Sequence, residues 1–266
     1  MNEPKRPDPV DIENVFNKFV IEYGGVLVSE MMPKDYKGKN ADYYFEKELV
    51  IAELKCLKKD LFRDESDKGR IFRLFDKWKA KKLIEPGDEF KILFGAKKLP
   101  VECNKDLTKA ASNSIEDAIR KANRQIRDSK VLLKQPHSKG ILLLANDGNY
   151  FLSHSKFLGI IGSLMSRKFI KSDIDAFVYF TVNQVAYMPD SELDWQLWIP
   201  GYRDDNGEKL GEFIKKMGHD FLHVFIPKIN GVALSGHIEI DEFNEAMDAI
   251  DRMKHIPKTV AYNKKK

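Results

Sequence analysis

The chain has 266 residues, of which 42% are hydrophobic and 32% are charged, and its formal net charge is +4. Such a composition is typical of a globular protein with its own core and excludes an intrinsically disordered chain. No apolar stretch reaches the roughly 20 residues that span a bilayer, so no membrane association is expected. The start of the chain lacks the apolar segment of a secretory signal, and its two cysteines are far apart, which favours a cytoplasmic location.

The first part of the chain shows a helix followed by strands. Residues 1–10 are polar and rich in proline, which predicts a disordered lead-in. From Asp11, a good N-cap, apolar residues recur at helical spacing until a glycine pair ends the pattern. Residues 26–32 are typical of a strand. Residues 41–55 predict a β-hairpin, with its tight turn near residues 46–48.

The middle of the chain alternates between helical and extended patterns. A basic segment, residues 57–83, predicts helix with a break near Gly69, and residues 90–103 suggest one or two strands. Residues 114–133 have the apolar stripe of an amphipathic helix. Residues 139–147 form an apolar run typical of a strand that is covered on both faces.

The remainder continues the alternation. Helices are predicted over residues 153–169 and 209–225, and strands within residues 174–188 and 195–200. The whole pattern predicts an α/β protein with a mixed central sheet flanked by helices. We expect a core over residues 11–150, an α/β extension packed on it over residues 151–257, and a basic tail over residues 258–266.

The second arm of the predicted hairpin carries charge in an apolar run. Glu53 and Lys55 lie two residues apart and therefore project on the same side of the strand. Across the hairpin, Asp42 can approach the same end of the sheet. Burying these charges is costly unless something offsets them, and two carboxylates are suitable ligands for a hard divalent cation. The pattern therefore predicts a metal site with a lysine beside it.

Asp42, ten intervening residues and Glu53-Leu54-Lys55 together resemble the motif of the PD-(D/E)xK nuclease superfamily. The resemblance implies a restriction-endonuclease-like core over residues 11–150. It implies that Asp42 and Glu53 bind Mg²⁺ or Mn²⁺, that the Leu54 carbonyl assists, and that Lys55 is catalytic. The proline that names the motif is absent, because Ala41 precedes Asp42.

Further residues follow from the same resemblance. Many members carry another acidic residue on the first helix, for which Glu13 is the best match and Glu22 the alternative. Many also carry a glutamine or lysine on the helix after the motif strand, for which Lys121, Arg124 and Gln125 are the candidates. The candidate nucleic-acid contacts are Lys58, Lys59, Lys121, Arg124, Gln125 and Arg127. For any one basic cluster, an ordinary solvated face is the favoured interpretation.

Other matches to parts of these patterns carry less weight. Glu-x-Lys also occurs at Glu3 and at Glu89, but neither has an upstream hairpin arm with an aspartate. His219 and His223 have the spacing of zinc ligands on one helix, although a packed or surface pair is favoured there. At Glu53 itself, the alternative to a metal site is a surface ion pair with Lys55.

We therefore expect a metal-dependent nuclease that hydrolyses DNA phosphodiester bonds by water attack. The resemblance suggests an endonuclease in prokaryotic or phage restriction, defence or repair, and RNA is not excluded as substrate. The resemblance also makes a homodimer possible, because a duplex has two strands to cut. The alternative is a nuclease-like domain that binds nucleic acid or a protein partner without cleaving; the intact acidic residues and lysine count against it.

Overall fold

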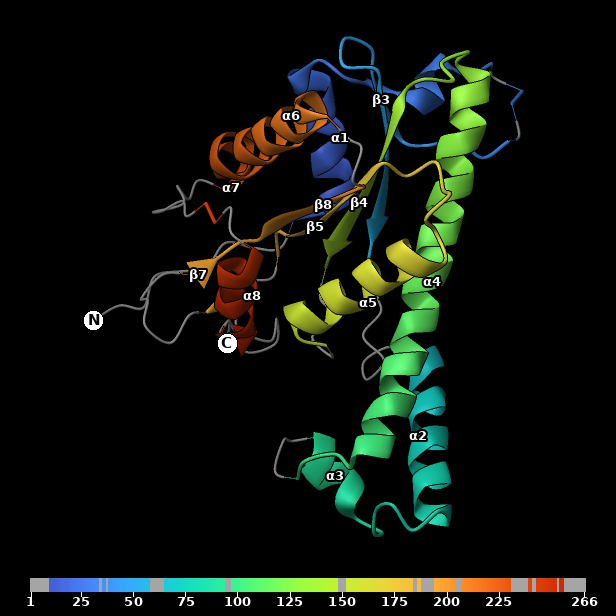
Figure 1. Cartoon of the computed structure of the whole chain (residues 1–266), viewed down its shortest axis with the longest axis vertical. Coiled ribbons are helices and arrows are strands. Elements are labelled where there is room, and N and C mark those ends of the chain that lie inside the picture. Colours follow the sequence, from blue (N-terminus) through green and yellow to red (C-terminus); the bar gives the residue numbers. More distant parts are fainter. Residues whose placement is uncertain are drawn as a thin grey trace. The chain divides into compact units, whose positions relative to one another are not determined.

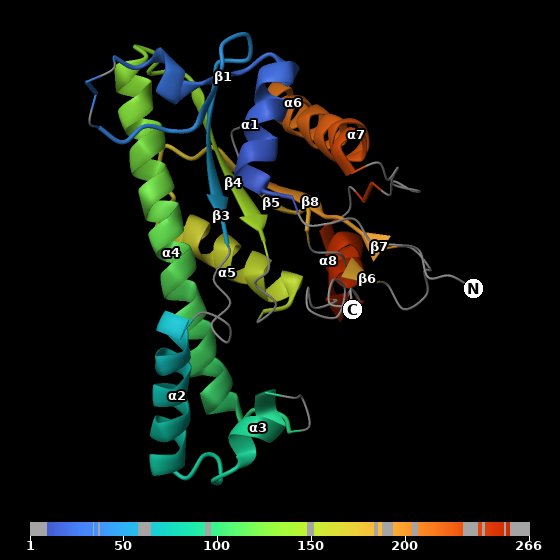
Figure 2. The same ribbon diagram turned by 180° about the vertical axis from the view of Figure 1, so that it is seen from behind.

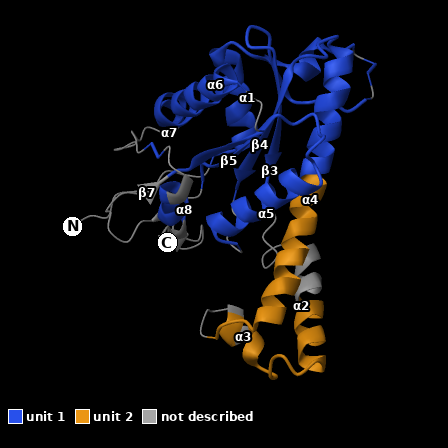
Figure 3. Ribbon diagram, in the orientation of Figure 1, with its two compact units in different colours: residues 1–58, 119–266 blue, residues 59–118 orange. Residues whose placement is uncertain are grey.

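The structure is a computed structural model. It describes residues 10–33, 35–36, 38–57, 65–93, 97–147, 152–183, 186–187, 194–203, 207–230, 239–240, 243–252 and 254–255. The chain divides into two compact units, which Figure 3 shows in different colours. The sheet unit comprises Met1–Lys58 and Ile119–Lys266, and the helical unit comprises Lys59–Ala118. Most of the predicted lead-in, residues 1–9, and the whole predicted basic tail lie outside the described residues.

The sheet unit begins with the predicted helix, α1 (Ile12–Tyr23). Asp11 caps its start, accepting a hydrogen bond from the Asn14 backbone at 3.4 Å, and Gly24 ends it with a positive φ of 94°. The predicted strand over residues 26–32 is wrong beyond its first two residues. Only β1 (Val26–Leu27) is extended, and a 3₁₀ turn (Val28–Met31) follows. β1 ends at Leu27, opposite Tyr43, which is the first residue of the neighbouring strand.

The predicted hairpin is confirmed, and it belongs to a mixed sheet. Within the described ranges, six strands form this sheet in the order β1-β2-β3-β4-β5-β8. The strands β3, β4 and β5 run parallel to one another, and the outer pairs are antiparallel. The strands after β1 are β2 (Tyr43–Phe45), β3 (Val50–Cys56), β4 (Lys139–Asn146), β5 (Ala176–Thr181) and β8 (Trp198–Tyr202).

One face of this sheet packs on α1 and on a long continuous helix over residues 208–230 (Figures 1 and 2). That helix consists of α6 (Glu208–His219), a π-helical segment (Asp220–Phe225) and α7 (Ile226–Asn230). Phe16 and Phe221 meet edge to face at 4.8 Å between ring centroids, at the centre of a buried apolar cluster. Alternate residues of β3, such as Ala52 and Leu54, project into the cluster.

The opposite face of the sheet is covered by the C-terminal part of α4 (Val101–Leu132) and by α5 (His154–Arg167). There the Tyr179 ring stacks on Phe157, and its hydroxyl lies 2.8 Å from His154 Nδ1. The predicted helix at residues 153–169 and the predicted strand at residues 139–147 are both confirmed. Strands of the predicted extension, β5 and β8, continue the same sheet, so the expected boundary at residue 150 falls inside one compact unit.

The remaining short elements of the sheet unit lie apart from this sheet. β6 (Ala186–Tyr187) pairs antiparallel with both β7 (Asp194–Trp195) and β9 (Lys254–His255). The last described helix is α8 (Phe243–Arg252), whose Ala249 and Ile250 are buried. The described elements together confirm the predicted α/β class, a mixed sheet flanked by helices.

The helical unit contains α2 (Glu65–Ala80), α3 (Asp88–Leu93) and the first part of α4. The predicted break near Gly69 is wrong, since α2 runs through it. The predicted strands within residues 90–103 are also wrong, because this stretch contains the end of α3 and the start of α4. Apolar runs this short do not distinguish a strand from a packed helix. The α4 helix therefore begins at Val101 rather than near residue 114.

Candidate functional site

The predicted site lies where β3 extends beyond its partner β2. The two strands pair from Phe45 with Val50 up to Tyr43 with Ala52, and β3 continues to Cys56 without β2 beside it. Asp42 immediately precedes β2. Its Oδ2 accepts a hydrogen bond from the Leu54 backbone N–H at 2.8 Å. The Asp42 carboxylate therefore lies at the edge of β3 beyond the last residue pair with β2.

Glu53 is the most deeply buried acidic residue of the site, with an exposed fraction of 0%. Burial, followed by repulsion from Asp42, raises the pKa of Glu53 to about 8, and the nearby Lys55 only partly offsets this. Glu53 Oε1 accepts a hydrogen bond from Lys55 Nζ. Its other oxygen, Oε2, is buried and has no hydrogen-bond partner among the described residues. The site therefore contains a carboxylate oxygen that the described protein groups leave unsatisfied.

Lys55 connects this carboxylate to α4. Its Nζ also lies 3.0 Å from Gln125 Oε1, and Gln125 Nε2 in turn donates to the Asn40 carbonyl at 2.8 Å. One turn further along α4, the buried Ser129 Oγ accepts the Ala41 N–H at 2.7 Å. Two side chains of α4 therefore hold the segment that leads into Asp42. Gln125 was one of several candidates from the sequence. Ser129 was not predicted, because the only sequence signal for it is its spacing of four residues from Gln125, which places both side chains on one face of the helix.

Asp42 and Glu13 interact through charge. Burial raises the pKa of Asp42, the hydrogen bond from Leu54 opposes this rise, and the Glu13 carboxylate adds to it by repulsion. Glu13 is exposed in the first turn of α1. The alternative residue, Glu22, is exposed near the other end of the same helix. The charge of Glu13 therefore acts on the cluster, although its side chain is open to solvent.

The predicted nucleic-acid contacts lie in different places. Lys58 and Lys59 are outside the described residues. Lys121 is exposed one turn before Gln125 and on the same side of α4. Arg124 is exposed about 100° around the helix from Gln125. Arg127 projects from about 160° around the helix from Gln125, and its Nε lies 3.8 Å from Asp128 Oδ1. The helix therefore presents Lys121, but not Arg127, towards the edge where Lys55 lies.

The donor groups suit a divalent cation. Asp42 and Glu53 provide carboxylate oxygens, which hard cations prefer, and Glu53 Oε2 is buried without a partner among the described residues. In the described part of the chain, no three His, Cys, Asp or Glu side chains form a metal centre on their own. The two carboxylates would therefore need a further ligand from the backbone or from water, as oxygen-coordinated Mg²⁺ commonly has.

The competing patterns lead elsewhere. Glu89 and Lys91 lie on α3, where Glu89 pairs with Lys79 at 2.8 Å. His219 and His223 have ring centroids 5.3 Å apart, and His219 Nδ1 lies 3.3 Å from Asp220 Oδ1. The other Glu-x-Lys match, at Glu3, is outside the described residues.

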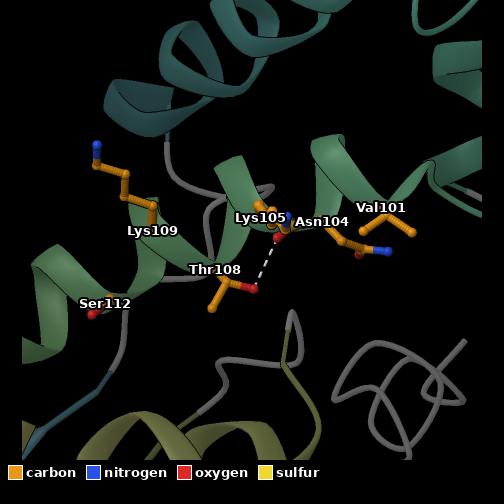
Figure 4. Close-up of a pocket in the computed structure, with 6 residues that line it drawn as sticks. All are labelled: Val101, Asn104, Lys105, Thr108, Lys109 and Ser112. Carbon is orange, nitrogen blue, oxygen red and sulfur yellow. Dashed lines mark hydrogen bonds between the residues drawn. The ribbon is translucent and has the colours of Figure 1, made fainter. Parts of the chain in front are cut away.

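A surface hollow on α4 belongs to the helical unit and contains none of the predicted site residues. There the Thr108 hydroxyl donates to the Asn104 carbonyl at 2.8 Å, as Figure 4 shows. The hollow is lined by Val101, Asn104, Lys105, Thr108, Lys109 and Ser112. With no carboxylate among these six residues, it lacks the ligands that a hard cation prefers.

Comparison with protein families, curated proteins and solved structures gave no match for this chain. None of the helices in the described ranges is both long enough and apolar enough to cross a membrane. The functional interpretation of the site therefore depends on the contacts, burial and charges of its own residues.

Proposed function

We propose that this chain is a metal-dependent nuclease of the PD-(D/E)xK type, with a restriction-endonuclease-like core, that hydrolyses DNA phosphodiester bonds. The main support is the environment of Glu53, which is fully buried, has an unpartnered Oε2 among the described residues and lies beside Asp42. Two acidic groups buried together repel each other and lose hydration. A bound divalent cation would offset the repulsion and the lost hydration. A hairpin with a purely structural role would gain nothing from two buried acidic groups.

Each residue then has a distinct task. Asp42 and Glu53 would hold Mg²⁺ or Mn²⁺, and the ion, when bound, supplies a Lewis acid that polarises a phosphate oxygen and acidifies water. Lys55, held between Glu53 and Gln125, would orient the attacking water and offset negative charge on the phosphate. Its fixed position matters, because charge stabilisation is strongest when the donor is already placed.

The surrounding charges favour a nucleic-acid substrate. Lys121 is exposed on the Gln125 side of α4, one turn from the contact with Lys55, where it can bind a phosphate. Phosphate contacts of this kind do not read sequence, so they are compatible with DNA and RNA alike. We favour DNA and an endonuclease, working in restriction, defence or repair, from the resemblance of the motif; cleavage of RNA is an outcome of the test.

The test is cleavage of supercoiled DNA, linear DNA and RNA by the full chain with Mg²⁺, Mn²⁺ or EDTA. We expect cleavage with either ion and none with EDTA. Asp42→Asn and Glu53→Gln should each abolish cleavage and weaken Mn²⁺ binding in titration calorimetry, because each removes a ligand charge with little change of shape. Glu22→Gln is the matched control, since Glu22 lies on α1 away from the start of the helix.

Two results would count against the proposal. If the wild-type chain cleaves none of these substrates with any ion, it is at most a nucleic-acid or protein-binding domain. If both carboxylate variants bind Mn²⁺ as tightly as the wild type, Asp42 and Glu53 are not the ligands.

A further inference from the structure

The β2–β3 ladder ends at the pair of Tyr43 with Ala52, although the chain continues on both sides. Tyr43 pairs with Ala52, so the next hydrogen-bonded pair of a regular antiparallel ladder would be Ala41 with Leu54. Such a pair exchanges both N–H···O bonds. Here neither Ala41 nor Leu54 donates to the other: the Leu54 N–H donates to Asp42 Oδ2 at 2.8 Å, and the Ala41 N–H donates to a side chain of α4 at 2.7 Å.

The interruption affects the Leu54 carbonyl. In an extended strand the N–H and C=O of one residue lie on the same edge, so the Leu54 carbonyl points to the edge where Asp42 lies. Its regular partner would be the Ala41 N–H, which Ser129 Oγ binds instead. The carbonyl oxygen is thereby kept out of the β2–β3 ladder, on the strand edge where the Asp42 carboxylate lies.

The group that diverts the Ala41 N–H is well fixed. Ser129 has an exposed fraction of 0%, so its hydroxyl cannot exchange this hydrogen bond for one with bulk water. One helical turn earlier, Gln125 binds the carbonyl of Asn40 at 2.8 Å. Two consecutive residues before Asp42 are therefore held by side chains on one face of α4, and the Ala41 N–H is engaged by Ser129 rather than by Leu54.

We propose that Ser129 is a positioning residue that keeps the Leu54 carbonyl available as a third oxygen ligand for the divalent cation. The metal part of this inference rests on the proposed function. Ser129 does for Ala41 what a proline at that position would do covalently, because proline has no N–H to donate into the ladder. Without the serine hydroxyl, the Ala41 N–H would pair with Leu54 and the carbonyl would be lost to the ion.

The test uses the full chain with Ser129→Ala, Ala41→Pro and the double variant. Selective ¹⁵N-alanine and ¹³C-carbonyl-leucine labelling allows NMR detection of a scalar coupling across an Ala41–Leu54 hydrogen bond. We expect no coupling in the wild type and a clear coupling in Ser129→Ala. Titration calorimetry should show Mn²⁺ affinity falling about tenfold in Ser129→Ala, as for other residues that support metal ligands. The double variant should regain wild-type affinity, because it has no Ala41 N–H.

Ser138→Ala is the matched control, because Ser138 is also a buried serine of the sheet unit but precedes β4. It should change neither the coupling nor the affinity. If Ser129→Ala does not fold, Ser129→Cys fills the same space with a weaker acceptor and should shift both readouts in the same direction.

The two proposals fail in distinguishable ways. No coupling in a folded Ser129→Ala protein, or a coupling already present in the wild type, overturns the role of Ser129. Unchanged Mn²⁺ affinity in Ser129→Ala despite a new coupling overturns the carbonyl as a ligand. A wild-type chain that binds no Mn²⁺ refutes the metal site, while the coupling still decides whether Ser129 holds the ladder open.

Discussion

At the scale of single residues, Glu53 is the most informative group in the chain. It is a carboxyl group inside a sheet, and its surroundings favour the protonated form as long as no cation is bound. Lys55 is close enough to donate a hydrogen bond to it, yet burial and Asp42 outweigh that contribution. A residue with this balance responds strongly to pH and to ions, which makes it a direct probe of the site.

The first prediction concerns stability against pH. Because the pKa of Glu53 is raised to about 8, the folded protein retains a proton that the unfolded chain releases near its ordinary pKa of 4.5. The free energy of unfolding should therefore fall as pH rises through this window, by at most about 1.4 kcal/mol per pH unit for this group. The raised pKa of Asp42 acts in the same direction.

Urea unfolding of EDTA-treated protein at a series of pH values measures this effect. The contribution should be fully present below about pH 4.5 and lost above about pH 8. Glu53→Gln, which cannot ionise, should flatten the profile. Saturating Mn²⁺ should also flatten it in the wild type, because a bound cation keeps the Glu53 carboxylate of the folded protein deprotonated. Identical slopes for the wild type and Glu53→Gln would show that Glu53 is not titrating in this window.

The second prediction separates chemistry from binding at Lys55. Since Lys55 contacts Glu53 and Gln125 and is not itself a ligand, Lys55→Ala should retain Mn²⁺ binding and most DNA affinity. Its single-turnover cleavage rate should fall about a hundredfold or more. Lys55→Arg should restore little, because a guanidinium is larger and does not deprotonate.

The measurement is single-turnover cleavage, together with DNA binding in Ca²⁺. Lys156→Ala, at an exposed position of α5, is the control with the same substitution. A Lys55→Ala protein that cleaves at the wild-type rate would mean that this lysine is structural.

At the scale of elements, β4 shows how tightly the sheet holds its neighbours. Gly140, near its start, donates its N–H to Asp175 Oδ2 at 2.8 Å and accepts the Asp175 N–H at 2.7 Å. A Cβ atom at Gly140 would overlap the Asp173 carbonyl and lie 2.8 Å from Ile126 Cγ2 on α4. The close approach of β4 to the Asp173 backbone, in the segment before β5, thus requires a residue without a side chain, and the α4 side chain of Ile126 adds to this crowding.

The third prediction follows from this contact. Gly140→Ala should lower the free energy of unfolding by about 3 kcal/mol, because the clash involves backbone that cannot rotate away. Gly159→Ala, in the interior of α5 with nothing within 4 Å of the added Cβ, should instead raise it by about 0.5–1 kcal/mol. Chemical denaturation of both variants provides the comparison. Equal effects of the two substitutions would contradict the packing described at Gly140.

At the scale of the whole molecule, the chain forms two compact units, and the candidate site residues that are described all belong to the sheet unit. The helical unit has its own core. Phe75 meets Trp78 edge to face at 5.4 Å, and the Trp78 indole N–H donates to Asp106 Oδ2 at 2.9 Å. The same Asp106 oxygen accepts a hydrogen bond from Lys77 at 2.8 Å, so one carboxylate joins α2 to α4.

The fourth prediction tests the independence of the units. Phe75→Ala removes a buried ring and should destabilise the helical unit by about 3–5 kcal/mol. Hydrogen exchange read by mass spectrometry should therefore accelerate in peptides from residues 65–118, while peptides covering β3 and β4 keep wild-type protection. Mn²⁺ affinity should also be unchanged. Equal loss of protection in β3 would show that the two units unfold together.

Local sequence determined much of this molecule. Asp11 and the glycine pair mark both ends of α1, and the period-two pattern with a short turn predicts the β2–β3 hairpin. The same alternation places Glu53 and Lys55 on one face. These features were predictable because each depends on residues within about one turn or one hairpin of one another.

Only the tertiary structure decided the rest. Gln125 lies 70 residues from Lys55, and Ser129 lies 88 residues from Ala41, so no local pattern pairs them. The short apolar runs near α3 became helix, and β5 and β8 joined the main sheet. The physical reason is the same in each case: a short segment adopts the conformation in which distant parts of the chain bury its apolar atoms and satisfy its hydrogen bonds.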